Sequence, residues 1–104
     1  MKSRKARSDR NHVVYMLANT NTGEYYVGIT VCGPKPKQAL KVRWQKHVRR
    51  AVTEGKDWPL CASIREHGAD TFDMEVIETV RGRLAAHGRE RELIRELCPA
   101  LNQY

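Results

Sequence analysis

The chain has 104 residues, which is enough for one compact domain with a modest hydrophobic core. Its 19 lysines and arginines outnumber its 12 acidic residues, and the net charge of +7 favours an anionic partner, most commonly nucleic acid, with an acidic membrane surface as the alternative. No apolar run approaches the roughly 20 residues that span a bilayer, and no signal-peptide segment opens the chain, so we expect a cytoplasmic protein without a membrane partner.

The first residues are rich in lysine and arginine and contain almost no side chain that a core could bury. We expect residues 1–11 to form a flexible basic arm, followed by a single domain over residues 12–104. Such an arm serves either as a solubilising tail or as a non-specific tether to phosphates. The two roles differ in how strongly salt weakens nucleic-acid binding.

The next segment has the pattern of an antiparallel β-hairpin. Residues 13–18 and 25–30 are rich in β-forming side chains. The residues between them are asparagine, threonine and Gly23 with one acid, which is a composition typical of a turn.

A basic loop should follow the hairpin. Residues 31–37 contain one glycine and two prolines, which interrupt regular structure. Lys35 and Lys37 make this loop positive, and we expect both to contact nucleic acid.

A helix is expected from about Gln38, with an apolar stripe that packs on the sheet. Arg43 and His47 are four residues apart and should lie together beside that stripe, at the border of the core. Lys46 and Arg50 point mostly to water, where they can bind nucleic acid. The stripe residues recur at intervals of three and four: Leu40, Trp44, Val48, Ala51 and Val52.

Two more helices and one more strand complete the expected fold. Trp58-Pro59 begins a short second helix, because proline suits the first turn. Residues 72–77 have the pattern of a third strand, and residues 82–97 that of a last helix. The fold class is therefore α+β: a small three-stranded antiparallel sheet, made of the hairpin plus one strand, flanked by about three helices.

Glu90 is difficult to explain as structure alone. Leu93, Ile94 and Leu97 form the apolar stripe of the last helix, and continuing this stripe backwards reaches Glu90, which puts a carboxylate on the core side. Desolvating an unpaired carboxylate costs roughly several kcal/mol, so a cation or a metal ion should meet it. The two interpretations are an ion pair with a nearby arginine such as Arg43 and a metal site.

Six short motifs follow one another along the chain: Val13-Val14-Tyr15, Tyr26-Val27-Gly28, Arg43-Trp44-Gln45-Lys46-His47, Ile64 to Gly68 with Phe72, Glu90, and Leu101-Asn102. Taken in this order, the motifs resemble those of the GIY-YIG endonuclease family. Each motif alone is a weak signal, but six in one order across one small domain are specific. Val13 stands where the first motif of the family has a glycine, and nothing resembles a separate DNA-targeting domain.

The resemblance implies metal-dependent hydrolysis of DNA phosphodiester bonds. Glu90 would hold one Mg²⁺ or Mn²⁺ per active site, because carboxylate and water oxygens suit these hard ions. Arg43 would make a forked contact with phosphate oxygens, which a lysine would do less well. Tyr15 or Tyr26 would orient or deprotonate the attacking water, and His47 would assist proton transfer or contact phosphate.

Two residues are expected to support the site without touching the reacting groups. A glycine inside a strand weakens it, so Gly28 suggests a close approach of backbone or substrate. Asn102 would staple the terminal segment to the wall of the site through side-chain hydrogen bonds. For Trp58, packing at the start of the second helix is favoured over stacking on a base.

The favoured substrate is double-stranded DNA, with single-stranded DNA or RNA as an alternative. A nucleic-acid-binding module of the same fold without turnover is the alternative function. A homodimer or a targeting partner, the sequence specificity and the choice between nicking and double-strand cutting all stay open.

Overall fold

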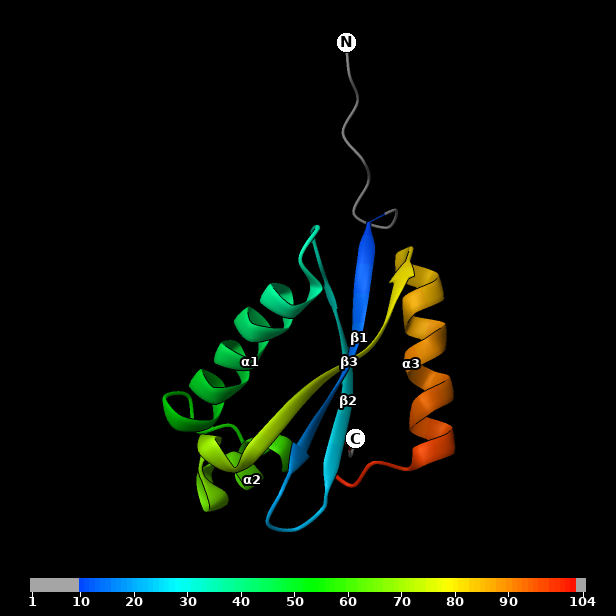
Figure 1. The fold of residues 1–104 in the computed structure, drawn as a ribbon. Coiled ribbons are helices and arrows are strands. Elements are labelled where there is room, and N and C mark those ends of the chain that lie inside the picture. The colour runs from blue at the N-terminus through cyan, green and yellow to red at the C-terminus, as the bar shows by residue number, and fades with distance from the viewer. Residues whose placement is uncertain (1–9, 103–104) are drawn as a thin grey trace.

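The sheet is built around a central strand that is buried on both faces. The computed structural model describes residues 10–102, and in it β1 (Asn11–Asn19) lies between β2 (Tyr25–Val31) and β3 (Phe72–Arg81), antiparallel to both (Figure 1). The expected basic arm lies outside the described residues except at its end, where Asn11 is already the first residue of β1.

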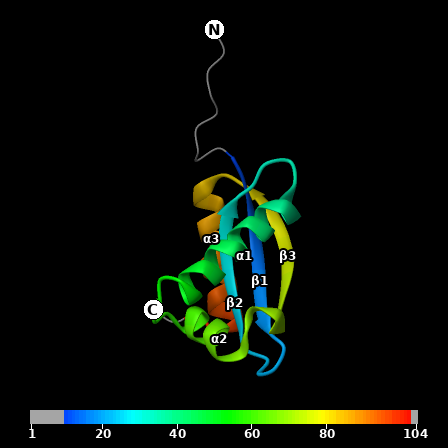
Figure 2. The ribbon, with the colours of Figure 1, turned by 90° about the vertical axis from the view of Figure 1, so that its left-hand side faces the viewer.

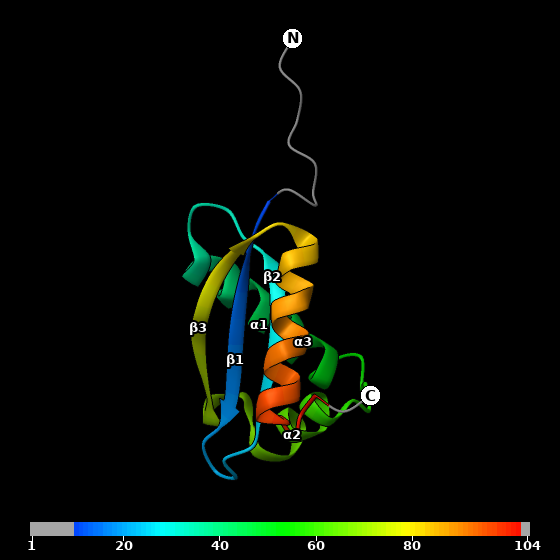
Figure 3. The same ribbon diagram turned by 90° about the vertical axis from the view of Figure 1, so that its right-hand side faces the viewer.

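Helices cover both faces of this sheet. α1 (Pro36–Val52) and α2 (Pro59–His67) lie on one face and α3 (Arg83–Leu97) on the other, and a short 3₁₀ helix, η2 (Ala69–Thr71), leads into β3 (Figure 1). Figure 2 looks onto the face that α1 crosses, and Figure 3 looks onto the face along which α3 runs. The predicted α+β fold is confirmed. No helix within residues 10–102 has the length and apolar character needed to cross a membrane.

The alternation of side chains along β1 gives each face of the sheet its own core. Val13, Tyr15 and Leu17 pack toward α1 and α2, whereas Val14 packs toward α3, and all four are fully buried. The sheet therefore separates the two cores. A group on α1 and a group on α3 can act on each other only across the sheet or around its edge.

A β-bulge in β3 adapts that strand to both cores. The register between β1 and β3 shifts between Val14 and Tyr15, which leaves Ile77 as an extra residue. In a regular strand Ile77 and Val80 would point to opposite faces, because side chains alternate. The bulge places both against the core on the α3 side.

Three expected helix details were wrong. α1 begins at Pro36 and not near Gln38. Proline fits the first turn of a helix, because an N–H at that position would have no partner within the helix. The connection between β2 and α1 is therefore shorter than expected and consists of residues 32–35. Val52 is 68% exposed and Leu97 is also exposed. Each is the last residue of its helix and lies beyond the part that the core covers.

The segment after α3 closes the outer edge of β2. The Asn102 side chain donates a hydrogen bond to the carbonyl of Val27 (2.7 Å) and accepts one from the Val27 N–H (2.6 Å). The Leu101 N–H donates to the carbonyl of Tyr25 (3.1 Å). These backbone groups lie on an edge strand and would otherwise be unpaired. Leu101 and Asn102 therefore pair with the outer edge of β2 as a neighbouring strand would.

We expect Asn102→Ala to lower the free energy of unfolding by about 2 kcal/mol or more, because it leaves the buried N–H and C=O of Val27 without partners. Urea unfolding followed by far-UV circular dichroism measures this loss. The control is Gln45→Ala, which removes an exposed amide from α1 and should change stability by less than about 0.5 kcal/mol. Equal losses in the two variants would contradict the edge-closing role.

Candidate active site

The site begins with a tyrosine that lies over a glycine. Tyr15 on β1 pairs directly with Gly28 on β2, and its ring crosses the backbone of β2 on the face that α1 covers. A Cβ atom added at Gly28 would lie 2.6 Å from the Tyr15 Oη atom and 2.8 Å from a ring carbon of Tyr26. The missing side chain of Gly28 therefore makes the room in which both tyrosine rings lie.

A hydrogen bond joins this tyrosine to α1. The Tyr15 hydroxyl is 3.0 Å from Nε2 of His47, and both groups are buried. The ring of Tyr26 meets the same imidazole edge-on, with 5.4 Å between the ring centroids. Strands β1 and β2 and helix α1 thus contribute one aromatic group each to a single cluster.

Burial keeps the titratable members of this cluster uncharged. It raises the pKa of Tyr15 above the ordinary value of 10.0, an effect that Arg43 and Tyr26 only partly offset. Burial also lowers the pKa of His47 to about 4, with the positive charges of Arg43 and Arg50 adding to the effect. At neutral pH His47 is a neutral imidazole, and so it can accept a proton.

Two polar atoms of α1 are buried without a hydrogen-bond partner in the described part of the chain. They are Nε of Arg43 and Nδ1 of His47, one turn apart on the same helix. A buried N–H without a partner costs about 1–3 kcal/mol, so a donor of this kind is ready for an incoming oxygen. The arginine side chain offers such an oxygen a positive charge as well.

Glu90 lies on α3, on the opposite face of the sheet from α1, yet it acts on the same cluster. Its negative charge contributes to the raised pKa of Tyr15, and the Arg43 charge acts on the Glu90 carboxyl in turn. The side chain of Glu90 is 18% exposed, and burial raises its pKa. The side chain that contacts its carboxylate, at 3.6 Å, is His87, and not Arg43 as the sequence had suggested.

The His87 contact was missed, although its position three residues before Glu90 is the spacing at which helix side chains meet. Within residues 10–102 there is no group of three or more histidine, cysteine, aspartate or glutamate side chains that could hold a metal ion. Any ion at Glu90 would therefore keep most of its waters. A partly desolvated single carboxylate fits Mg²⁺ or Mn²⁺ in this respect, because Mg²⁺ keeps several waters in protein sites.

A hollow of about 520 Å³ opens beside the aromatic cluster. Tyr26 and Asn102 line it on the side of the sheet, while His47 and Arg50 of α1 and Trp58 before α2 line it on the side of the helices. Tyr15 is fully buried and does not line this hollow, whereas Tyr26 does. Of the two tyrosines, Tyr26 is the one that a bound molecule can reach there.

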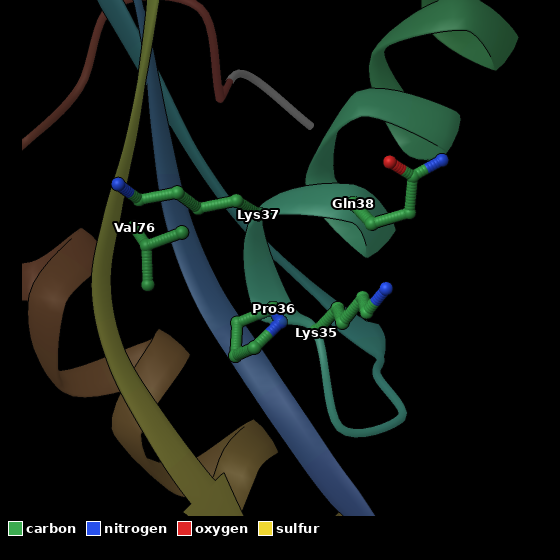
Figure 4. Close-up of a pocket in the computed structure, with 5 residues that line it drawn as sticks. All are labelled: Lys35, Pro36, Lys37, Gln38 and Val76. Carbon is green, nitrogen blue, oxygen red and sulfur yellow. The ribbon is translucent and has the colours of Figure 1, made fainter.

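The structure separates the four expected nucleic-acid contacts into two pairs. Lys46 and Arg50 lie on α1 at helical spacing from Arg43 and His47; Lys46 shares a surface depression with Arg43, and Arg50 shares the hollow with His47. Lys35 and Lys37 instead line a depression at the start of α1, next to Val76 of β3 (Figure 4). β3 is the strand at the other edge of the sheet from β2, so this second pair is apart from the site.

Trp58 is exposed, contrary to the packing that we favoured for it. Half of its surface is accessible (51%), and the residues of α2 that enter the core are Leu60, Cys61 and Ile64. The short helix is anchored by these residues, and the tryptophan that precedes them is left at the surface.

Comparison with known proteins agrees with this arrangement. A family model described as the GIY-YIG catalytic domain matches residues 11–104, so the chain belongs to the GIY-YIG family, and it is an endonuclease by class. No curated protein matches the chain.

Two solved structures share the fold. The catalytic domain of the homing endonuclease I-TevI has a TM-score of 0.68 and 22% sequence identity, with 89% of this chain and 95% of that chain covered. An alanine mutant of the catalytic domain of the intron endonuclease I-TevI has a TM-score of 0.70 and 22% identity, with 90% and 91% covered.

We expect Gly28→Ala to disrupt the site, because its Cβ would overlap the Tyr15 hydroxyl, which is buried and has no room to move. The free energy of unfolding should fall by about 1–3 kcal/mol, the usual cost of overpacking. Gly33→Ala is the matched control, since a Cβ there meets no atom within 4 Å. Chemical unfolding of the two variants measures the difference, and a Gly28→Ala protein as stable as Gly33→Ala would contradict this steric role.

The lowered pKa of His47 predicts a loss of stability in acid. The unfolded chain binds a proton at this histidine below about pH 6.5, whereas the folded protein does so only near pH 4, so protonation favours unfolding between these values. The free energy of unfolding should fall by up to about 3 kcal/mol across this window. His47→Gln should flatten this part of the curve, and His67→Gln should not. Parallel curves for wild type and His47→Gln would contradict the prediction.

Proposed function

We propose that this protein is a divalent-metal-dependent endonuclease that hydrolyses phosphodiester bonds of DNA. The observation that carries the proposal is the buried Arg43 Nε atom without a partner in the described part of the chain, one helical turn from His47, which bonds Tyr15 and lines the hollow. The net charge of +7 and the I-TevI homing endonuclease domain as a structural neighbour support a DNA substrate.

Arg43 binds the phosphate in this proposal. Its guanidinium donates two parallel hydrogen bonds to phosphate oxygens and offsets the negative charge that develops as water attacks phosphorus. The phosphate oxygen supplies the partner that the buried Nε lacks in the free protein. A lysine at this position would supply charge without the forked geometry.

In this proposal the aromatic cluster orients the attacking water and accepts its proton. Tyr26 faces the hollow and orients the water. As the water gives its proton to Tyr26, Tyr26 passes its own to the buried Tyr15, and Tyr15 passes its own to the neutral imidazole of His47, a weak base that holds it only transiently. Gly28 supports this cluster by leaving room for both rings, and Asn102 fixes the adjoining strand.

Glu90 is the residue that would hold the metal ion, one Mg²⁺ or Mn²⁺ per site. When bound, such an ion supplies a positive charge that stabilises the attacking and leaving oxygens. Glu90 contributes a carboxylate that burial makes dependent on a polar partner, and the His87 imidazole lies 3.6 Å from it in the free protein.

The substrate backbone follows α1. Lys46 and Arg50 contact further phosphates along α1, beyond the one held by Arg43, since the three residues follow one another along one side of the helix. Lys35 and Lys37 contact DNA only if it also reaches β3. Double-stranded DNA in the cytoplasm is the favoured substrate, and a second copy of the chain or a targeting partner would be needed for cutting both strands in one event.

The test is cleavage of supercoiled plasmid and of single-stranded DNA with Mg²⁺, Mn²⁺ or EDTA. We expect metal-dependent nicking by the wild type and a loss of at least roughly 100-fold in Glu90→Gln, the order found when one charge-stabilising group is removed. The control is Glu92→Gln, which removes an exposed carboxylate from the same helix and should cut normally.

Cutting by Glu90→Gln at the wild-type rate would overturn the role of this residue. Salt-sensitive binding by the wild type without cutting of either substrate would instead identify a binding module without turnover.

A further inference from the structure

The exposed indole of Trp58 lies in a polar, positively charged setting. The guanidinium carbon of Arg50 is 5.6 Å from the ring centroid, and the ammonium nitrogen of Lys56 is 5.7 Å away. Single apolar side chains on a surface need no explanation, but a half-exposed aromatic ring with two cations within about 6 Å of its centroid differs from those. The two charges attract a phosphate backbone to the place where the ring is accessible.

A network of hydrogen bonds fixes the segment that presents this ring. The guanidinium of Arg65 on α2 donates to the carbonyl of Ala51 (3.0 Å) and to that of Lys56 (2.6 Å), and it lies 3.7 Å from the carboxylate of Asp57. These contacts tie the end of α1 to the residues just before Trp58. The ring is therefore positioned before any ligand arrives, which lowers the entropy cost of binding.

The ring also lines the same hollow as the residues proposed for catalysis. Trp58 lines it together with His47 and Arg50 of α1 and Tyr26 of β2. A volume of about 520 Å³ is within the usual range for small-molecule sites. A flat aromatic group that entered here would meet the indole while its attached phosphate met α1.

We propose that Trp58 is a stacking platform for an unpaired nucleobase of the substrate, adjacent to the phosphate that is cut. The proposal rests on the nuclease function proposed above and deepens it. Stacking of a base on an aromatic side chain is tolerant of sequence and contributes about 1–3 kcal/mol per base. In single-stranded DNA the base is already free, whereas a perfect duplex must first release it at a cost of a few kcal/mol.

The chain offers a direct optical test, because Trp44 and Trp58 are its only tryptophans. Trp44 is partly buried, packs against Phe72 with 5.3 Å between the ring centroids and does not line the hollow, so Trp58→Phe removes the one tryptophan that lines it. The difference in fluorescence between wild type and Trp58→Phe therefore reports Trp58 alone. All titrations are done in EDTA, so that no cutting occurs.

The probes are a short oligothymidylate, an abasic oligomer of the same length, a perfect duplex and a duplex with one unpaired thymidine. We expect the oligothymidylate and the duplex with the unpaired base to quench the fluorescence of the wild type, and the abasic oligomer and the perfect duplex to leave it unchanged. Trp58→Phe should show no quenching. Trp58→Ala should weaken binding of the oligothymidylate by roughly 10-fold, and Trp58→Phe by less.

The control variant is Leu84→Ala, which removes the most exposed large hydrophobic side chain of the described residues from α3 and should bind like the wild type. Equal affinities of wild type and Trp58→Ala, or equal quenching by the abasic oligomer, would overturn the stacking platform. Plasmid cutting without quenching refutes this inference alone. Quenching without cutting supports the platform and refutes the nuclease function.

Discussion

The arrangement of the site depends on one missing side chain. Gly28 lies on β2 directly opposite Tyr15 on β1, and only the absence of a Cβ allows the phenol ring to cross the strand and reach His47 on α1. Without that crossing, the hydroxyl would have no route to the helix. The hydrogen bond between sheet and helix, and the position of Tyr26 beside it, follow from this single steric condition.

Burial then decides the charge of the site. It makes ionisation of Tyr15, His47 and Glu90 more difficult, because each charged form loses its hydration. Arginine is the exception, since its guanidinium stays protonated in proteins. The cluster therefore combines neutral proton donors and acceptors with a fixed positive charge on Arg43. Such a combination attracts an anion and leaves proton transfer to groups that are not already ionised.

Sequence reasoning reached the fold, because the fold depends on local patterns. The strand and helix periodicities, and the order of Tyr15, Arg43, His47 and Glu90 along the chain, are visible in the sequence. The exposure of the Val52 side chain could not be predicted from the sequence, because it depends on where the sheet ends beneath α1. Neither periodicity nor composition specifies such long-range geometry.

The predictions that Trp58 is packed and that Arg43 is the partner of Glu90 were wrong for a related reason. A tryptophan before a proline is as consistent with packing as with exposure, and only the tertiary structure shows that three other residues of α2 fill the core. Arg43 was a plausible partner for Glu90 by charge, but the intervening sheet makes the neighbouring His87 the nearer contact.

The contact between Asn102 and Val27 has a consequence for the order of folding. The two residues are 75 positions apart, so their pairing closes a long loop and is entropically expensive until the intervening elements have folded. A chain emerging from the ribosome can form its hairpin and α1 long before residue 102 is available. Until then the outer edge of β2 has unpaired backbone groups, which are the groups through which strands of different chains associate. The segment with Leu101 and Asn102 thus protects the β2 edge only in the completed domain, and the nascent domain must fold without this protection.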